Sequence, residues 1–281
     1  MGATSSSRLK DRAPATTATL IKQEPHVQKS SAMEGVTAQW PERIWVVRHG
    51  QSAGNVARDH AEANNITLIE LEHRDADVPL SSLGQRQSQA LGAWAEGLSE
   101  HQRPQVVLAS PYVRARQTAQ AVADALGGDH RLVIDERLRE KEFGVLDRYT
   151  SSGIVATFPE LAAQRRLVGK FYFRPPGGES WCDVILRLRG VVGDLQRNHA
   201  GARVMIVAHQ VIVNCMRYLL EGMDEQTILD IDRQGDVPNC GVTEYHVVED
   251  GRLALARANF IPPELADTPT TASPDQPAGA R

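Results

Sequence analysis

The sequence predicts an α/β fold, a three-layer α/β/α sandwich around a mostly parallel central sheet. Three short runs are apolar at every position, which is typical of parallel strands covered on both faces: 44–47, 106–109 and 204–208. Longer patterns with apolar residues at helical spacing predict helices at 82–98, 112–126, 180–197 and 211–220. Because strands and helices alternate along the chain, we expect helices on both faces of one sheet.

Two apolar runs near the end of the chain, 242–248 and 252–259, flank Asp250-Gly251. This arrangement predicts a hairpin at the edge of the sheet. Residues 43–261 are therefore expected to form one domain, whose length suits a single α/β unit. The segments 1–42 and 262–281 are polar or rich in Pro, Ala and Thr, and we predict that both are disordered tails.

The composition indicates a globular protein and excludes several classes. The 281 residues are 41% hydrophobic and 23% charged, enough to bury a sizeable core. A net charge of -4 argues against a protein built mainly to bind nucleic acid. No apolar run is long enough to span a membrane, and no secretory signal precedes the core. The three cysteines form no CxxC pair, so we expect a cytoplasmic protein without a disulfide framework. From the net charge and the apolar runs, we expect neither a nucleic-acid partner nor a membrane partner.

Histidines and arginines follow each of the three predicted strands. Arg48-His49 comes after the first strand, Arg114 lies shortly after the second, and His209 comes after the third. The carboxyl ends of neighbouring parallel strands meet at one edge of the sheet, where α/β proteins bind ligands. We therefore expect these side chains to converge. Helical spacing favours Arg114 over Arg116, which is rotated by roughly 200° from it.

This set of side chains suits a tetrahedral dianion. Arg48 and Arg114 can each offer a forked pair of N–H donors to phosphate oxygens. Predicted helix starts near Gly50 and Ser110 would direct backbone N–H groups to the same place. No carboxylate occupies an adjacent ligand position in these segments, and arginines would repel a cation, so no metal site and no cofactor are expected.

A proton donor is predicted in the segment 138–144, which presents Glu140 and Glu142 before a glycine. A carboxyl group that faces a phosphate ester could keep its proton and act as a general acid. Taken alone, each of these glutamates also fits a solvated surface carboxylate. His49 and His209, each taken singly, fit a structural role equally well.

In combination, these residues resemble the histidine phosphatase superfamily, also called phosphoglycerate mutase-like. The matching segments follow one another in order: 48–55, 79–84, 110–119, 140–144, 176–180, 207–209 and 239–243. The resemblance implies a phosphoglycerate mutase-like fold in which His49 is the nucleophile and carries the phosphoryl group.

The resemblance also implies the roles of the surrounding residues. Arg48, Arg114 and His209 would bind the phosphoryl oxygens, and Glu140 would protonate the leaving oxygen. Asn55 and the backbone of Gln210 would help to seat the phosphate.

Within the superfamily, 158–160, 171–176 and Gln210 look nearest to the fructose-2,6-bisphosphatase branch. Arg174 falls where that branch places an arginine that binds the sugar phosphate. Gly177 and Asn214 replace a lysine and an arginine of the branch and so remove charge expected for a second phosphate. We therefore predict a metal-independent phosphomonoesterase that hydrolyses a small phosphorylated metabolite, of undetermined identity, through a phosphohistidine.

The sequence leaves two alternative functions open and argues against two others. A phosphoglycerate mutase-type phosphotransferase remains open, although the short stretch between Asp147 and Pro176 argues against a closed lid. A phosphate-binding module without turnover also remains open. A haloacid-dehalogenase-type phosphatase would need a strand before Asp75-Ala76-Asp77, and the preceding residues are polar. A cysteine phosphatase would need an arginine six residues after a cysteine, which no cysteine here has.

Overall fold

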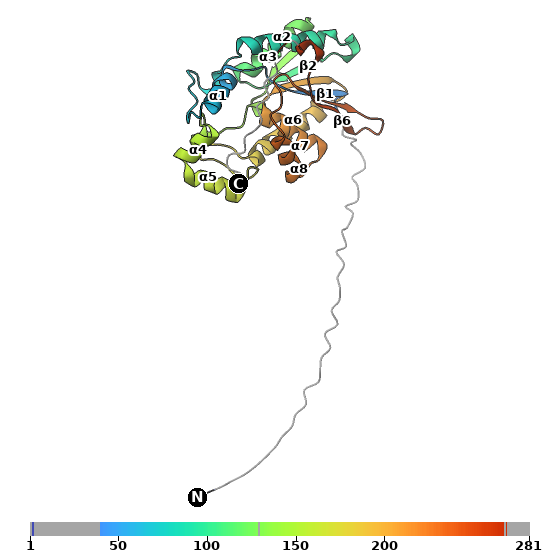
Figure 1. Cartoon of the computed structure of the whole chain (residues 1–281). Coiled ribbons are helices and arrows are strands. Elements are labelled where there is room, and N and C mark those ends of the chain that lie inside the picture. The colour runs from blue at the N-terminus through green and yellow to red at the C-terminus, as the bar shows by residue number, and fades with distance from the viewer. Residues whose placement is uncertain (1, 3–39, 129, 267, 269–281) are drawn as a thin grey trace. The chain divides into compact units, whose positions relative to one another are not determined.

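A computed structural model describes residue 2 and residues 40–128, 130–266 and 268 (Figure 1). Most of the two segments predicted to be tails lies outside the described residues. The described residues continue beyond 261, the predicted end of the domain. Pro263–Leu265 forms a short 3-10 helix, η5, which lies against α2 (Ser82–Gly97), and Leu265 is fully buried.

Six strands form one mostly parallel sheet in the order β3-β2-β4-β1-β5-β6. Their bounds are Arg43–Arg48 (β1), Val106–Ala109 (β2), Arg131–Ile134 (β3), Arg203–Ala208 (β4), Val242–Val247 (β5) and Leu253–Phe260 (β6). β3, β2, β4 and β1 run parallel, and the β5–β6 hairpin joins antiparallel to β1. The predicted fold class, the three strands and the edge hairpin are confirmed. β3 was not predicted, because this edge strand is only four residues long and none of them is fully buried.

Eight helices accompany the sheet in the described residues. The remaining bounds are Ala53–Ala63 (α1), Val113–Leu126 (α3), Ser151–Thr157 (α4), Pro159–Val168 (α5), Trp181–Asn198 (α6), Gln210–Glu221 (α7) and Glu225–Arg233 (α8). The four predicted helices correspond to α2, α3, α6 and α7. Sequence patterning missed α4 and α5 because each buries a single small residue, Gly153 and Ala162, and so has no apolar face to recognise.

The core is divided between the two faces of the sheet. Alternate residues of β1 point to opposite faces, so Trp45 packs with α2 and α3 while Ile44 packs with α6 and α7. Figure 1 shows α2 and α3 on one side of the sheet and α6 and α7 on the other. This burial on both faces is what the continuous apolar runs predict.

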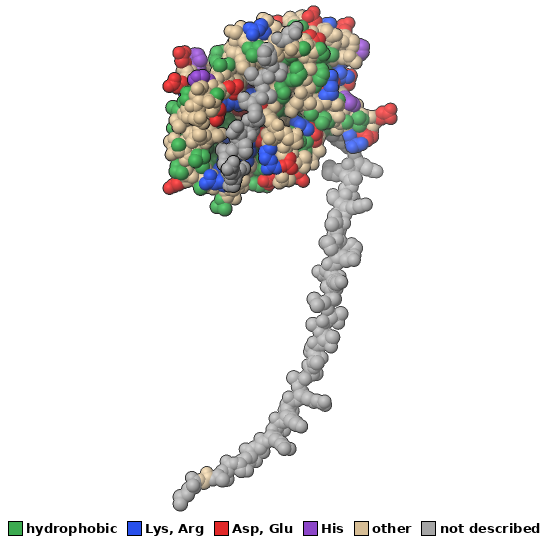
Figure 2. Space-filling model, viewed as in Figure 1, with side chains coloured by type: hydrophobic (Ala, Val, Ile, Leu, Met, Phe, Trp, Pro, Cys, Tyr) green, Lys and Arg blue, Asp and Glu red, His purple; other side chains and the backbone are tan. Residues whose placement is uncertain are grey.

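Other parts of the chain lie beyond the carboxyl ends of the parallel strands. α1, α4 and α5 contribute walls to a cavity there, described below. On the face shown in Figure 2, acidic and basic side chains are interspersed over the described residues. None of the described helices combines the length and the apolarity needed to cross a membrane.

Candidate active site

The register of the parallel strands brings the predicted site residues together. Arg48 pairs with Ala208 across β1 and β4, and Ala109 pairs with Val207 across β2 and β4. The backbone continues this pattern for one more residue, because the His49 amide donates to the Ala208 carbonyl at 2.9 Å. His49 and His209 therefore leave the sheet from adjacent strands at the same level.

The two imidazoles and Arg114 are in direct contact. The ring centroids of His49 and His209 are 5.1 Å apart, and the rings meet edge-on. Arg114 Nε donates to His49 Nε2 at 3.3 Å. His209 is fully buried, and its Nε2 lies 2.7 Å from the Ser110 hydroxyl. Arg114 is buried while Arg116 is exposed, as the helical spacing requires.

The hydrogen bonds of His49 prepare its Nε2 as a nucleophile. His49 Nδ1 lies 2.6 Å from the Gly50 carbonyl oxygen, which can only accept, so Nδ1 carries the proton and Nε2 carries the lone pair. Burial, followed by the positive charges of Arg114 and Arg48, holds the pKa of His49 well below its ordinary value. The ring is therefore neutral at physiological pH. Burial and Arg114 lower the pKa of His209 in the same way.

Unpaired polar atoms lie beside the nucleophile. Arg48 donates through its guanidinium to the Val237 carbonyl and lies 3.6 Å from Asp236, but its Nε has no hydrogen-bond partner among the described residues. His209 Nδ1 is also buried without a partner in that part of the chain. A buried donor left unpaired costs about 1–3 kcal/mol, so such atoms indicate a group that binds there. Burial lowers the pKa of Arg48 only to about 10, and it remains cationic.

Arg114 has a carboxylate partner in the cavity. Asp75 Oδ1 lies 3.0 Å from Arg114 Nη1, and Asp75 Oδ2 accepts from Nη2 at 3.1 Å. Asp75 comes from a short 3-10 helix, η1 (Asp75–Asp77). The sequence drew attention to Asp75 only as half of an Asp-x-Asp motif, and nothing in that pattern indicated Arg114 as its partner.

The structure separates the two glutamates of the predicted acid segment. Glu140 lines the cavity, whereas Glu142 is exposed and accepts from the Tyr112 hydroxyl at 3.1 Å. Burial raises the pKa of Glu140 and Asp75 raises it further, while the Lys141 amide (2.8 Å) and Arg114 oppose the shift. The net rise lets Glu140 keep its proton to higher pH than an ordinary carboxyl group.

The loop 176–180 fixes the backbone that carries Glu140. The Glu179 amide donates to the Glu142 carbonyl at 2.9 Å, and the Glu179 carboxylate binds both Arg139 and Arg187. Arg187 in turn donates to the Glu140 carbonyl at 3.2 Å. Two segments recognised separately in the sequence therefore form one structural unit.

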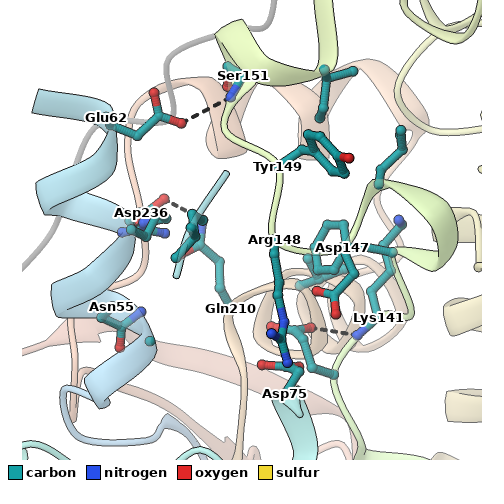
Figure 3. Close-up of a pocket in the computed structure, with 18 of the residues that line it drawn as sticks. Asn55, Glu62, Asp75, Lys141, Asp147, Arg148, Tyr149, Ser151, Gln210 and Asp236 are labelled. Carbon is teal, nitrogen blue, oxygen red and sulfur yellow. Dashed lines mark hydrogen bonds and ion pairs between the residues drawn. The ribbon is translucent and has the colours of Figure 1, made fainter. Parts of the chain in front are cut away.

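Asn55 and Gln210 also line the cavity (Figure 3). Asn55 Oδ1 accepts from the Ser52 amide at 3.0 Å and so helps to cap α1. Gln210 is the first residue of α7, and its amide group donates to Asp236 at 2.6 Å. Figure 3 shows Asn55, Gln210 and Asp236 on one side of the cavity, opposite Lys141 and Arg148.

Arg174 does not reach the cavity. Its guanidinium pairs with Asp183 at the helix N-terminus of α6 and is 63% exposed. The cavity, of about 1160 Å³, is lined by other cations that sequence reasoning missed: Arg58, Lys141, Arg148, Arg165 and Lys170. Arg165 and Lys170 lie in and just after α5, a helix that no apolar pattern revealed, so no sequence signal placed them at the site. Within the described residues, no group of three or more His, Cys, Asp or Glu side chains is arranged to hold a metal ion.

Comparison with known proteins identifies the family. Residues 44–260 match the family model of the histidine phosphatase superfamily (branch 1). The chain belongs to this superfamily. The resemblance stated from the sequence is thereby confirmed, and the chain is an enzyme of the histidine phosphatase type.

Curated relatives come from two branches of the superfamily. A 6-phosphofructo-2-kinase/fructose-2,6-bisphosphatase of Caenorhabditis elegans is 30% identical over 177 residues, which cover 63% of this chain and 33% of the relative. The chain thus spans about a third of that relative's length. A relative from Enterobacter sp. (strain 638), named "Probable phosphoglycerate mutase GpmB", is 27% identical over 213 residues, 75% of this chain and 88% of GpmB.

Solved structures show the same fold. A mycobacterial glucosyl-3-phosphoglycerate phosphatase has a TM-score of 0.61 at 23% identity and covers 78% of this chain and 98% of its own. The alpha-ribazole phosphatase from Shigella flexneri has a TM-score of 0.61 at 22% identity and covers 78% of this chain and 96% of its own. The predicted phosphoglycerate mutase-like architecture is confirmed.

Proposed function

We propose that this enzyme is a phosphomonoesterase that hydrolyses a small phosphorylated metabolite through a phosphohistidine on His49. Supporting observations are the lone pair on His49 Nε2, the cations of Arg48 and Arg114 beside it, and a carboxyl group with a raised pKa on the cavity wall. Each matches one requirement of phosphoryl transfer, which needs an aligned nucleophile, charge stabilisation and a proton for the leaving group.

The reaction divides into two displacements. His49 Nε2 attacks phosphorus, the bond to the ester oxygen breaks, and Glu140 gives its proton to the departing alcohol. Water then attacks the phosphohistidine, the P–N bond breaks, and the Glu140 carboxylate takes the proton from water. Arg48, Arg114 and His209 stabilise the phosphoryl oxygens in both steps, and a covalent intermediate makes each displacement easier.

One observation carries the proposal: Arg48 Nε and His209 Nδ1, in two residues beside the nucleophile, are buried without hydrogen-bond partners among the described residues. Within the described residues, the other buried side-chain polar atoms without a partner are Arg43 Nε, Trp45 Nε1 and Gln210 Oε1. A bound phosphoryl group supplies acceptor oxygens for Arg48 Nε and His209 Nδ1 and removes the desolvation penalty.

The substrate is expected to be larger than its phosphate group and polar or anionic elsewhere. The cavity volume of about 1160 Å³ exceeds what a phosphoryl group fills, and Arg165 and Lys170 line it in place of Arg174. This charge supports a metabolite such as a sugar phosphate or a phosphorylated acid, the kinds of compound named for several relatives.

The test measures hydrolysis of p-nitrophenyl phosphate in EDTA by the wild type, His49→Ala and the surface control Arg174→Ala. We expect loss of turnover only in His49→Ala. We also expect acid-labile radiolabel on the wild type after mixing with a ³²P-labelled phosphate ester and rapid quenching. Equal rates in wild type and His49→Ala would overturn the proposal and leave the binding-module alternative, and inhibition by EDTA would indicate a metal-dependent enzyme.

The phosphoglycerate mutase alternative is distinguished by the fate of the phosphoryl group. α4 and α5 form a wall of the cavity from the segment between Asp147 and Pro176. The sequence predicts that this segment does not form a closed lid over the site, and this stays a prediction. With phosphoglycerate as substrate, release of inorganic phosphate faster than transfer between positions supports hydrolysis, and the reverse supports a mutase.

A further inference from the structure

Both lysines of the described residues lie in the same cavity. The described part of the chain is rich in arginine but contains only Lys141 and Lys170, and each lines the active-site cavity. Lysine is ordinarily among the most exposed residue types. Both lysine side chains of the described residues are therefore placed where a molecule in the cavity can contact them.

The two lysines differ in their partners. Lys170 forms an ion pair with Asp232 and lies 5.8 Å from the centroid of the Trp181 ring. Lys141 is only 8% exposed, and its ammonium group makes no hydrogen bond or ion pair within the described part of the chain. Its Nζ faces the Phe143 ring, 4.4 Å from the centroid. Lys141 is therefore the amine that is free to react with a molecule in the cavity.

The surroundings of Lys141 favour its neutral form. Burial lowers its pKa to about 8, and Arg165 and Lys170 contribute to the decrease, although Glu140 and Glu179 oppose it. Compared with a lysine at the ordinary value of 10.5, the neutral fraction near pH 7 rises about 300-fold. Only the neutral amine is nucleophilic, and lysines with such environments form Schiff bases in other proteins.

We propose that Lys141 is a covalent binding site for phosphorylated aldehydes: their phosphate group binds at Arg48, His49 and Arg114, and their carbonyl carbon forms an imine with Lys141 Nζ. This inference rests on the proposed function, because the phosphate group is what holds the aldehyde in the cavity. The imine occupies the substrate's position, so such compounds inhibit the enzyme reversibly.

The covalent step balances without a further reactant. The neutral Nζ attacks the carbonyl carbon, the C=O π bond breaks, and one nitrogen proton moves to the oxygen to give a carbinolamine. This intermediate then loses its hydroxyl group and the second nitrogen proton as water. The products are a C=N bond and one water molecule, with no oxidation or reduction. Addition of water reverses the reaction, and the phosphate ester is unchanged throughout.

The experiment uses pyridoxal 5′-phosphate as the probe and the full-length His49→Ala protein, which cannot turn over the probe's phosphate. Imines are trapped with borohydride, and each lysine is quantified by peptide mapping, including Lys10, Lys22 and Lys29 outside the described residues. Because the ion pair with Asp232 holds Lys170 in its charged form, we expect Lys141 to be labelled about tenfold more than Lys170. Excess inorganic phosphate should suppress this labelling, and pyridoxal without phosphate should label Lys141 about tenfold less.

Two lysine variants provide the matched controls. Lys141→Arg keeps a positive charge but cannot form an imine, and should abolish the labelling that phosphate suppresses. Lys170→Arg should retain labelling at Lys141. In enzyme with His49 intact, the probe should inhibit p-nitrophenyl phosphate hydrolysis, and borohydride should make this inhibition irreversible. In Lys141→Arg, the rate after treatment with probe and borohydride should stay close to the rate of the same variant without probe.

Two results would overturn the inference: equal labelling of Lys141 by pyridoxal and its phosphate, or labelling that falls on Lys170 instead. These results are independent of the proposed function, which is measured separately as turnover that depends on His49. Turnover without labelling at Lys141 would remove only this inference, whereas loss of turnover in wild type would remove the proposed function.

Discussion

Replacement of Asp75 by asparagine removes the negative charge that faces Arg114 while keeping the size of the side chain. In the structure, the Asp75 carboxylate lies 3.0 and 3.1 Å from the two terminal nitrogens of Arg114. These are the donors that a forked contact with phosphate would use. We therefore expect the carboxylate to compete with an incoming phosphoryl group, so that Asp75→Asn binds phosphate more tightly.

The size of this effect follows from the geometry. A hydrogen bond between charged groups contributes about 1.5–3 kcal/mol when it is buried. The Asp75 side chain is 36% exposed, and ion pairs this accessible to water contribute about 0.5–1 kcal/mol in total. The inhibition constant of inorganic phosphate should therefore fall about twofold to fivefold.

The assay is competition by phosphate, and by vanadate, against p-nitrophenyl phosphate at one fixed pH. Asp77→Asn is the matched control, because Asp77 lies in the same 3-10 helix but pairs with Arg74 on the surface. Its inhibition constant should not change. Weaker phosphate binding in Asp75→Asn would refute the reasoning and show that Asp75 instead holds Arg114 in place for the substrate.

Three further predictions concern the acid Glu140, the nucleophile His49, and Arg165 in the wall of the cavity. Glu140→Gln should slow hydrolysis of alkyl phosphates about 10²–10⁴-fold, but should affect p-nitrophenyl phosphate less, because nitrophenolate leaves without a proton; equal losses for both substrates would mean that Glu140 is not the acid. With alkyl phosphates, kcat/KM should fall when the pH drops through the lowered pKa of His49, because the nucleophile becomes protonated. It should also fall when the pH rises through the raised pKa of Glu140, because the acid loses its proton. Glu140→Gln should remove this second decline from the pH profile. Arg165→Ala should raise KM for an anionic substrate found by a metabolite screen, while Arg174→Ala should not; the opposite order would restore Arg174 to the substrate site.

Sequence reasoning succeeded where local pattern and strand topology determine position. His49, Arg114 and His209 each follow a buried parallel strand or begin the next helix, and parallel strands must end at one edge of a sheet. The contact between Arg114 Nε and His49 Nε2 follows from that rule together with the helical spacing that selects Arg114 over Arg116. These positions could be predicted because no side-chain detail was needed.

The other cations that line the cavity, such as Arg165 and Lys170, could not be predicted in the same way. They come from segments whose apolar pattern is weak. Contacts that shape the cavity also join residues far apart in the chain, such as Asp75 and Arg114.

Arg174 shows the converse case. The resemblance predicts that it binds substrate, whereas in the structure the carboxylate of Asp183, nine residues later at the start of α6, binds its guanidinium at the surface. A resemblance to a family predicts where a residue lies in the sequence motif, but it does not predict which neighbouring residues bind its side chain.

The carboxylates of the cavity have a common effect on phosphate affinity. Asp236 lies against Arg48, Asp75 against Arg114 and Asp232 against Lys170, so these three cations each have an acidic partner before any ligand arrives. Clustered cations without such partners would repel one another and destabilise the fold. We expect the same partners to weaken the binding of inorganic phosphate, because a product anion must displace or share them. In the transition state the charge is spread over the three equatorial oxygens, while the attacking and leaving groups lie in line on either side of phosphorus. Donors directed at those equatorial positions should therefore favour the transition state over the product, so we expect this neutralisation to lower the affinity for product more than that for the transition state.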